Sequence, residues 1–290
     1  MLEQSTLSSQ GIVFFIDYNE NVAYEKMVRY SILSLKYNNP DIQTAVIYCN
    51  DYKKSIENTI KDVCTYYIEV PQEVNTFGQA KKIANLYQIY FATPFEKTLY
   101  VDCDFLFFNN IDNIFRYLNK NSLCFFNSCN NFRGEKYNDI ASQDFFKLLN
   151  IPLVYNQLFL FKKDKVSLEY FNLLCQISNN WQVFYNTFLK IKFEFPDIKV
   201  NLSLALLLTD NNNLIKNNTT YINLAPLKIN YTDEKNIDFY KHSNLWIIPI
   251  GKIKYENYIL NMPVHYNNSL FLDNEFCLDF EKTIKNDYSF

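Results

Sequence analysis

Glycine is scarce in this chain, which has 290 residues and only four glycines. A glycine-rich phosphate loop needs several glycines close together, so the sequence excludes one. The chain has no basic run and a net charge of −3, which argues against a nucleic-acid partner. It has no apolar run near the ~18 residues of a transmembrane helix, and its first residues, MLEQSTLSSQ, lack the pattern of a signal sequence. We therefore expect a protein of the cytoplasm, or of the host cytoplasm if it is viral.

Cysteine pairs of metal-binding spacing are also missing. The seven cysteines are scattered along the chain, without a CxxC motif. This pattern argues against a disulfide framework and against a structural zinc site. What the chain does have is apolar and aromatic residues, which make up 48% and 18% of it, against 20% charged residues. That balance predicts a sizeable folded core.

Strand-like and helix-like segments alternate through the first hundred residues. Short apolar runs predict strands at 11–19, 44–50, 65–70 and 98–108, and helical patterns lie between them at 21–40, 51–64 and 79–95. This alternation is typical of an α/β fold with an open, mostly parallel sheet flanked by helices. Ligands bind such sheets at the carboxyl ends of the strands.

The second half of the chain is less regular. We expect strands at 122–128 and 153–163, helices at 167–178 and 201–208, and short strands in LWIIPIG and MPVHYNN. The stretch 209–223 is rich in polar residues and is predicted to be a mobile connection. Because no repeat or clear linker is present, we expect residues 1–290 to form a single domain with an irregular C-terminal half.

Two aspartates interrupt the most apolar of these strands, TLYVDCDFLFF (98–108). In a strand, residues i and i+2 point to the same face, so Asp102 and Asp104 are expected to point the same way. Ionised carboxylates in apolar surroundings need a compensating partner. Two hard oxygen ligands near the end of a strand favour Mg²⁺ or Mn²⁺. The alternative is a pair of surface or helix-capping aspartates.

The order of these motifs resembles a known family. The segments IVFFIDYNENVAYEKMVRYSILSL, PFEKTLYVDCDFLFFNNIDNIF and YNQLFLFKKD look like those of GT-A nucleotide-sugar glycosyltransferases. They are most similar to family-eight-like members, including divergent viral and phage ones. The resemblance covers about 11–163 and fades afterwards. It implies a Rossmann-like sheet and transfer of a sugar from a nucleoside diphosphate donor, UDP above all, to an acceptor hydroxyl of a glycan, protein or small molecule, with retention of configuration.

The resemblance also implies roles for individual residues. It assigns 11–163 to binding of the nucleotide-sugar and metal, and 164–290 to the acceptor and closure of the site. Within 11–163, Asp104 would ligate the metal directly and Asp102 would orient it and contact the donor. The further donor-binding candidates are Asp17, Tyr18, Lys81, Lys82, Asn156 and Gln157. The chain departs from the family in having Leu158 and Phe159 where a glycine is expected.

Two further features concern the metal and the chemistry. The family pattern has a late histidine as third metal ligand, and His265 in MPVHYNN matches it. The alternative is a surface or hydrogen-bonded histidine that binds no metal. Asp197 and Asn201 fall where the family places an acidic or amide residue near the reacting centre, so they join Asp102 and Asp104 as catalytic candidates. The same two residues would also suit a turn that caps the helix at 201–208.

Three other interpretations stay open. A phosphatase with a DxD nucleophile would also place aspartates at the end of a parallel strand, although it usually does so on the first strand and wants Thr or Val where Leu106 stands. A sugar-nucleotide pyrophosphorylase would need the missing glycine-rich loop. A degenerate GT-A domain would bind a nucleotide or glycan without turnover.

Overall fold

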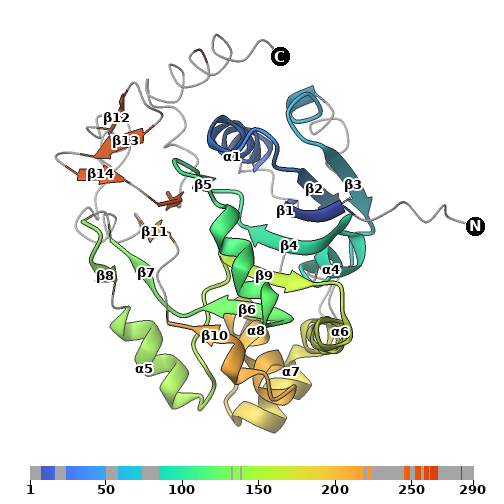
Figure 1. Ribbon diagram of the computed structural model, residues 1–290. Coiled ribbons are helices and arrows are strands. Elements are labelled where there is room, and N and C mark those ends of the chain that lie inside the picture. The colour runs from blue at the N-terminus through green and yellow to red at the C-terminus, as the bar shows by residue number, and fades with distance from the viewer. Residues whose placement is uncertain are drawn as a thin grey trace, which may run out of the picture.

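The fold was analysed in a computed structural model of the chain. The structure describes residues 8–16, 24–49, 58–73, 85–131, 133–137, 139–217, 221–223, 245–248, 252–255, 258–260, 262–266 and 282. Two sheets matter for the site, a large central one and a smaller one beside it (Figure 1). Among the described residues, no helix is long and apolar enough to cross a membrane.

The central sheet has seven strands, in the order β10-β6-β9-β4-β1-β2-β3. Only β9 runs antiparallel to its neighbours. All six other strands therefore end at the same edge of the sheet. The strands are β1 (Ser8–Ile16), β2 (Thr44–Cys49), β3 (Tyr66–Val70), β4 (Phe95–Val101), β6 (Leu123–Phe126), β9 (Leu158–Lys162) and β10 (Ile215–Lys216).

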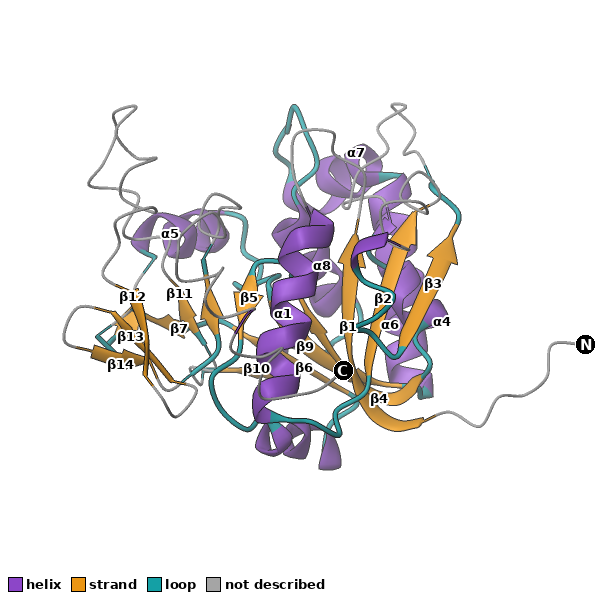
Figure 2. Ribbon diagram, turned by 90° about the horizontal axis from the view of Figure 1, so that it is seen from above, coloured by secondary structure: helices purple, strands orange, loops and turns teal. Residues whose placement is uncertain are grey.

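Helices cover both faces of this sheet (Figure 2). Alternate residues of β1 divide the core: Ile12 and Phe14 belong to the cluster that includes α1, and Val13 and Phe15 to the cluster that includes α6 and α8. This is the period-two pattern of a strand buried on both faces. The α-helices are α1 (Tyr24–Asn38), α4 (Gln88–Ala92), α5 (Ile140–Leu148), α6 (Lys165–Asn179), α7 (Trp181–Phe184) and α8 (Ile198–Leu208). The 3-10 helices are η2 (Asp112–Asn119) and η4 (Asn212–Leu214), and η3 (Tyr185–Leu189) is a π-helix.

The smaller sheet joins distant parts of the chain, in the order β5-β15-β11-β7-β8. Its strands are β5 (Phe105–Leu106), β7 (Cys129–Asn130), β8 (Lys136–Tyr137), β11 (Ile222–Asn223) and β15 (Val264–His265). A separate antiparallel sheet consists of β12 (Leu245–Ile248), β13 (Lys252–Tyr255) and β14 (Tyr258–Leu260). The pairing of β15 with β5 brings the late part of the chain to the end of β4.

The predicted α/β class and mostly parallel sheet are confirmed, with three local corrections. The aspartates do not lie in a continuous strand, because β4 ends at Val101 and they occupy the bend before β5. Stretch 209–223, predicted to be a mobile connection, contains β10 and β11, which pair into the two sheets. The 3-10 helix η2 was not predicted at all. The helices expected at 51–64 and 79–95 fall largely outside the described residues.

Candidate active site

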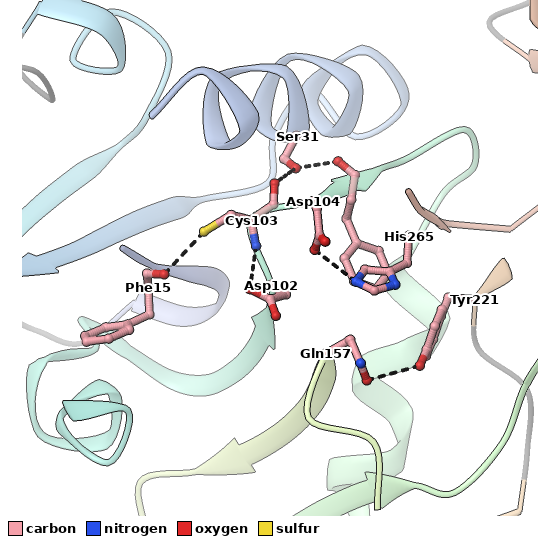
Figure 3. A network of polar contacts seen from close by, with 9 residues as sticks. Phe15, Ser31, Asp102, Cys103, Asp104, Gln157, Tyr221 and His265 are labelled. Carbon is pink, nitrogen blue, oxygen red and sulfur yellow. Dashed lines mark hydrogen bonds and ion pairs between the residues drawn. The ribbon is translucent and has the colours of Figure 1, made fainter. Parts of the chain in front are cut away.

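The candidate site is built on the bend that follows β4, at the carboxyl edge of the central sheet. The backbone N–H of Asp102 donates to the carbonyl of Gln157 at 2.8 Å, which ties the bend to the start of β9. Oδ1 of Asp102 accepts from the N–H of Cys103 at 2.9 Å. The Cys103 thiol points the other way and contacts the carbonyl of Phe15 at 3.3 Å. Figure 3 shows the two contacts of Cys103, with Asp102 and with Phe15.

Helix α1 fixes the same bend through a buried serine. The hydroxyl of Ser31 lies 3.0 Å from the carbonyl of Cys103 and is also bonded to the carbonyl of Phe105 (Figure 3). One turn later, Ser34 accepts from the N–H of Phe107 at 3.0 Å. Both serines are 0% exposed. Buried backbone groups outside regular pairing need partners, and α1 supplies them on both sides of Asp104.

His265 meets Asp104 across the smaller sheet. The register of β15 and β5 pairs His265 with Phe105, and the N–H of Tyr266 donates to the carbonyl of Asp104 at 3.1 Å. Nε2 of His265 then lies 3.0 Å from Oδ1 of Asp104. Their side chains are only 4% and 16% exposed. The structure therefore brings together two of the three predicted metal ligands, from distant parts of the chain.

This pair suits a divalent cation. Ligands about 2.1 Å from an octahedral cation lie roughly 3.0 Å apart when they are adjacent. The separation of Nε2 and Oδ1, 3.0 Å, is compatible with that value and is equally the distance of a direct hydrogen bond between the two side chains. A carboxylate oxygen and an imidazole nitrogen are also chemically suitable ligands for Mn²⁺. Within the described part of the chain, no group of three or more His, Cys, Asp or Glu side chains is placed to hold a metal. Asp104 and His265 thus form a pair of candidate metal ligands. Asp102 is the acidic residue nearest to this pair in sequence.

Tyr221 and Gln157 form the wall beside this pair. The phenol of Tyr221 donates to Oε1 of Gln157 at 3.4 Å, and its ring packs edge-on against Phe105 at 5.3 Å (Figure 3). Burial raises the pKa of Tyr221 well above its ordinary value, so the phenol stays protonated and can donate. The sequence analysis missed Tyr221, because a single tyrosine in an Asn-rich stretch carries no motif.

The predicted residues Asn156 and Gln157 lie beside the bend, and their part in donor binding stays a prediction. Gln157 holds the N–H of Asp102 with its carbonyl. Oδ1 of Asn156 is buried and has no hydrogen-bond partner among the residues described. Leu158 and Phe159, which replace the glycine of the family pattern, are both 0% exposed and pack into the two opposite core clusters. The core therefore accommodates their bulk.

The two other catalytic candidates make contacts within the helical layer. Asp197 is the N-cap of α8, and its Oδ1 accepts from the N–H groups of Lys199 and Val200 at 2.7 and 3.0 Å. Asn201 is 1% exposed and accepts from the phenol of Tyr185 at 2.6 Å. The bonds of Asp197 are the helix-capping arrangement that the sequence left open, whereas Asn201 lies within α8 and is buried. A catalytic part for either residue stays a prediction.

The remaining donor-binding candidates, Asp17, Tyr18, Lys81 and Lys82, lie outside the described residues. Asp17 directly follows the end of β1, which is the neighbour of β4 in the central sheet. Their roles in donor binding stay predictions.

No protein-family model and no curated protein sequence matches this chain. Solved structures do match. Mouse xyloside xylosyltransferase 1 is similar with a TM-score of 0.53 and 7% identity, over 89% of this chain and 98% of the mouse chain. Galactosyltransferase LgtC, solved with donor and acceptor sugar analogues, has a TM-score of 0.54 and 12% identity over 95% of both chains.

A third similar structure is the glycosyltransferase GlyE of Streptococcus pneumoniae, with a TM-score of 0.51 and 14% identity over 97% of this chain. This chain spans 63% of the length of GlyE. At these identities the likeness establishes the fold, and it confirms the α/β fold of GT-A type that the sequence predicted.

Proposed function

We propose that this protein is a glycosyltransferase that moves a sugar from a nucleoside diphosphate sugar to an acceptor hydroxyl, with Mn²⁺ or Mg²⁺ bound at the donor diphosphate. The contact between Asp104 and His265 carries the proposal. Both residues lie at the carboxyl edge of a mostly parallel sheet, where ligands of such folds bind, and this supports a metal site there. The likeness in fold to three glycosyltransferase structures supports the same activity.

The residues of the bend would bind the cation and orient the donor. Asp104 and His265 would hold the cation, which when bound neutralises charge on the leaving diphosphate. Because Ser31 holds the carbonyls on both sides of Asp104, the carboxylate keeps its place without reorganisation when the donor binds. The bond from Cys103 to Oδ1 of Asp102 fixes the orientation of that carboxylate, which we assign to donor contacts.

We assign the other donor contacts as the family resemblance implies. Asp17 and Tyr18 would contact a uracil nucleotide, Lys81 or Lys82 the nucleotide-sugar, and Asn156 and Gln157 the sugar. Retention of configuration and the division into a donor-binding part (11–163) and an acceptor part (164–290) belong to the same proposal.

A panel of nucleotides tests the proposal. UDP, GDP, CDP and ADP are each added with Mn²⁺ and with a chelator, and the melting temperature is measured. A ligand at about 100 times its dissociation constant adds roughly 2.7 kcal/mol of stability, which gives a clear shift. We expect UDP to raise the melting temperature only when the metal is present. In a separate assay with a UDP-sugar, we expect the protein to release UDP. If UDP binds but no UDP-sugar is ever consumed, the chain is a binding domain without turnover. A shift with none of the four contradicts the proposal and favours the phosphatase interpretation.

A further inference from the structure

A cavity lies at the same edge of the central sheet as the aspartates. It has a volume of about 270 Å³. Two of its lining residues, Asn127 and Asn217, directly follow the parallel strands β6 and β10, whose last residues Phe126 and Lys216 are paired. Strand β6 runs parallel to β4, because both are antiparallel to β9. The cavity and Asp102 therefore lie on the carboxyl side of the sheet, where substrates bind in folds of this kind.

The cavity is close enough to the candidate active site to share a substrate with it. Only β9 separates β6 from β4 in the strand order. Neighbouring strands are about 4.8 Å apart, so the ends of β6 and β4 are roughly 10 Å apart. A sugar and one substituent can span that distance. Tyr155, whose N–H donates to the carbonyl of Phe126 at 2.8 Å, links the end of β6 to the segment that leads to Asn156.

Two lysines line the cavity. Nζ of Lys136 donates to Oδ1 of Asn217 at 2.7 Å, which leaves two of its three protons for a ligand. Lys147, in the last turn of α5, lines the same cavity. It pairs with Asp144 at 3.7 Å, and because their side chains are 76% and 68% exposed, this surface ion pair is weak. Two ammonium groups at one cavity favour an anion.

The interior of the cavity suits a sugar ring. Its lining includes the apolar side chains of Phe146, Ile151 and Leu153, which can contact the face of a ring. It also includes the amide side chains of Asn127, Gln143 and Asn217, a residue type that can hydrogen-bond sugar hydroxyls.

We propose that this cavity binds the acceptor, and that the acceptor sugar carries an anionic group, a phosphate or a carboxylate, which pairs with Lys136 and Lys147. The inference rests on the proposed glycosyltransferase function and names the class of its acceptor. It also moves part of acceptor binding into the segment 127–153, because among the lining residues only Asn217 comes from the later part of the chain.

Direct binding of simple probes tests the inference. The full chain is titrated calorimetrically with glucose 6-phosphate, glucuronic acid and glucose, at low and at high salt. We expect at least one anionic probe to bind ten or more times more tightly than glucose, with the advantage falling as salt rises. A preference for glucose 6-phosphate identifies a phosphate-bearing acceptor, and a preference for glucuronic acid a carboxylate-bearing one. Equal affinities for all three, or no binding at tens of millimolar, overturn the inference.

Matched variants locate the binding. In the double variant Lys136→Gln/Lys147→Gln we expect the anionic preference to vanish. The control is Lys165→Gln, which removes a lysine that is 87% exposed on α6 and should keep the preference. Equal loss in the control, or no loss in the double variant, overturns the assignment. The metal-dependent melting shift with UDP is measured on the same proteins. If the unmodified protein shows this shift but prefers no anionic probe, only the present inference fails. If the unmodified protein shows no shift with UDP, the proposed function fails.

Discussion

His265 approaches Asp104 with its Nε2 atom 3.0 Å from Oδ1, although the two residues come from distant parts of the chain. The approach depends on the pairing of two short strands, β15 and β5, in which His265 lies opposite Phe105. The histidine ring also packs against Phe105 at 5.0 Å and near Tyr221 at 6.2 Å. Its position is therefore set by backbone pairing and by ring contacts.

Asp104→Asn should abolish metal-dependent nucleotide binding while the fold persists. The amide is nearly the same size as the carboxylate but is neutral, so it is a much weaker ligand for a hard cation. We expect the melting shift with UDP and Mn²⁺ to disappear, and the melting temperature without ligand to stay close to that of the unmodified protein. Glu169→Gln, which removes a carboxylate that is 62% exposed on α6, is the control and should keep the full shift. A normal shift in Asp104→Asn would show that this carboxylate holds no metal.

His265→Phe should separate ligation from packing. Phenylalanine keeps a ring against Phe105 and Tyr221 but has no nitrogen for a cation. We expect the Mn²⁺ concentration for half-maximal UDP binding to rise at least tenfold, and urea unfolding to change little by comparison. Tyr266→Phe, at the neighbouring position, is the control and should keep the Mn²⁺ requirement unchanged. A variant that binds Mn²⁺ as tightly as the original would leave His265 with a structural part only.

The sequence was sufficient for the parts of the site that follow local rules. The alternation of strands and helices predicted the parallel sheet, and Asp102 and Asp104 fell at its carboxyl edge because β4 ends just before them. The expected pairing of His265 with the aspartates came from a family pattern, since a strand of two residues gives no periodic signal. Ser31 and Tyr221 belong to no such pattern. Ser31 is bonded to a buried backbone carbonyl and Tyr221 to the side chain of Gln157, and only the tertiary structure determines these partners.

Ser31→Ala should loosen the bend and weaken metal binding together. The variant leaves two buried carbonyls, those of Cys103 and Phe105, without the hydroxyl that bonds them. An unsatisfied buried group costs about 1–3 kcal/mol, so we expect a loss of this order in urea unfolding. The Mn²⁺ requirement for UDP binding should rise as well, because the backbone on both sides of Asp104 is no longer fixed.

Ser203→Ala is the matched control for this change. Ser203 is also 0% exposed and lies on a helix, α8, but its hydroxyl has no hydrogen-bond partner among the described residues. Removing it should leave stability and metal binding unchanged or slightly improve stability. If Ser31→Ala loses stability but keeps the original Mn²⁺ requirement, then Ser31 supports the fold and not the position of Asp104.

Gly11→Ala should destabilise the central sheet through a single contact. A Cβ added at residue 11 would overlap the ring of Phe95, the first residue of the neighbouring strand β4. Phe95 is 0% exposed, so its ring can only shift against other buried atoms. Overpacking of this kind costs about 1–3 kcal/mol, measured as a lower urea midpoint. Adding Phe95→Leu to the variant removes the clashing ring and should recover part of the loss. A double variant no more stable than Gly11→Ala alone would place the strain elsewhere.

Cys64 should make the stability of the protein fall at alkaline pH. Burial raises the pKa of its thiol from 9.0 to about 11, against a smaller opposite effect of Lys36. The folded protein therefore keeps the thiol neutral between these values while the unfolded chain ionises it, which favours the unfolded state as the pH rises. The contribution is fully present below pH 9 and is lost progressively up to about pH 11. Urea midpoints from pH 8 to 11 should fall less steeply for Cys64→Ser than for the unmodified protein, and parallel curves would show that this thiol titrates alike in both states.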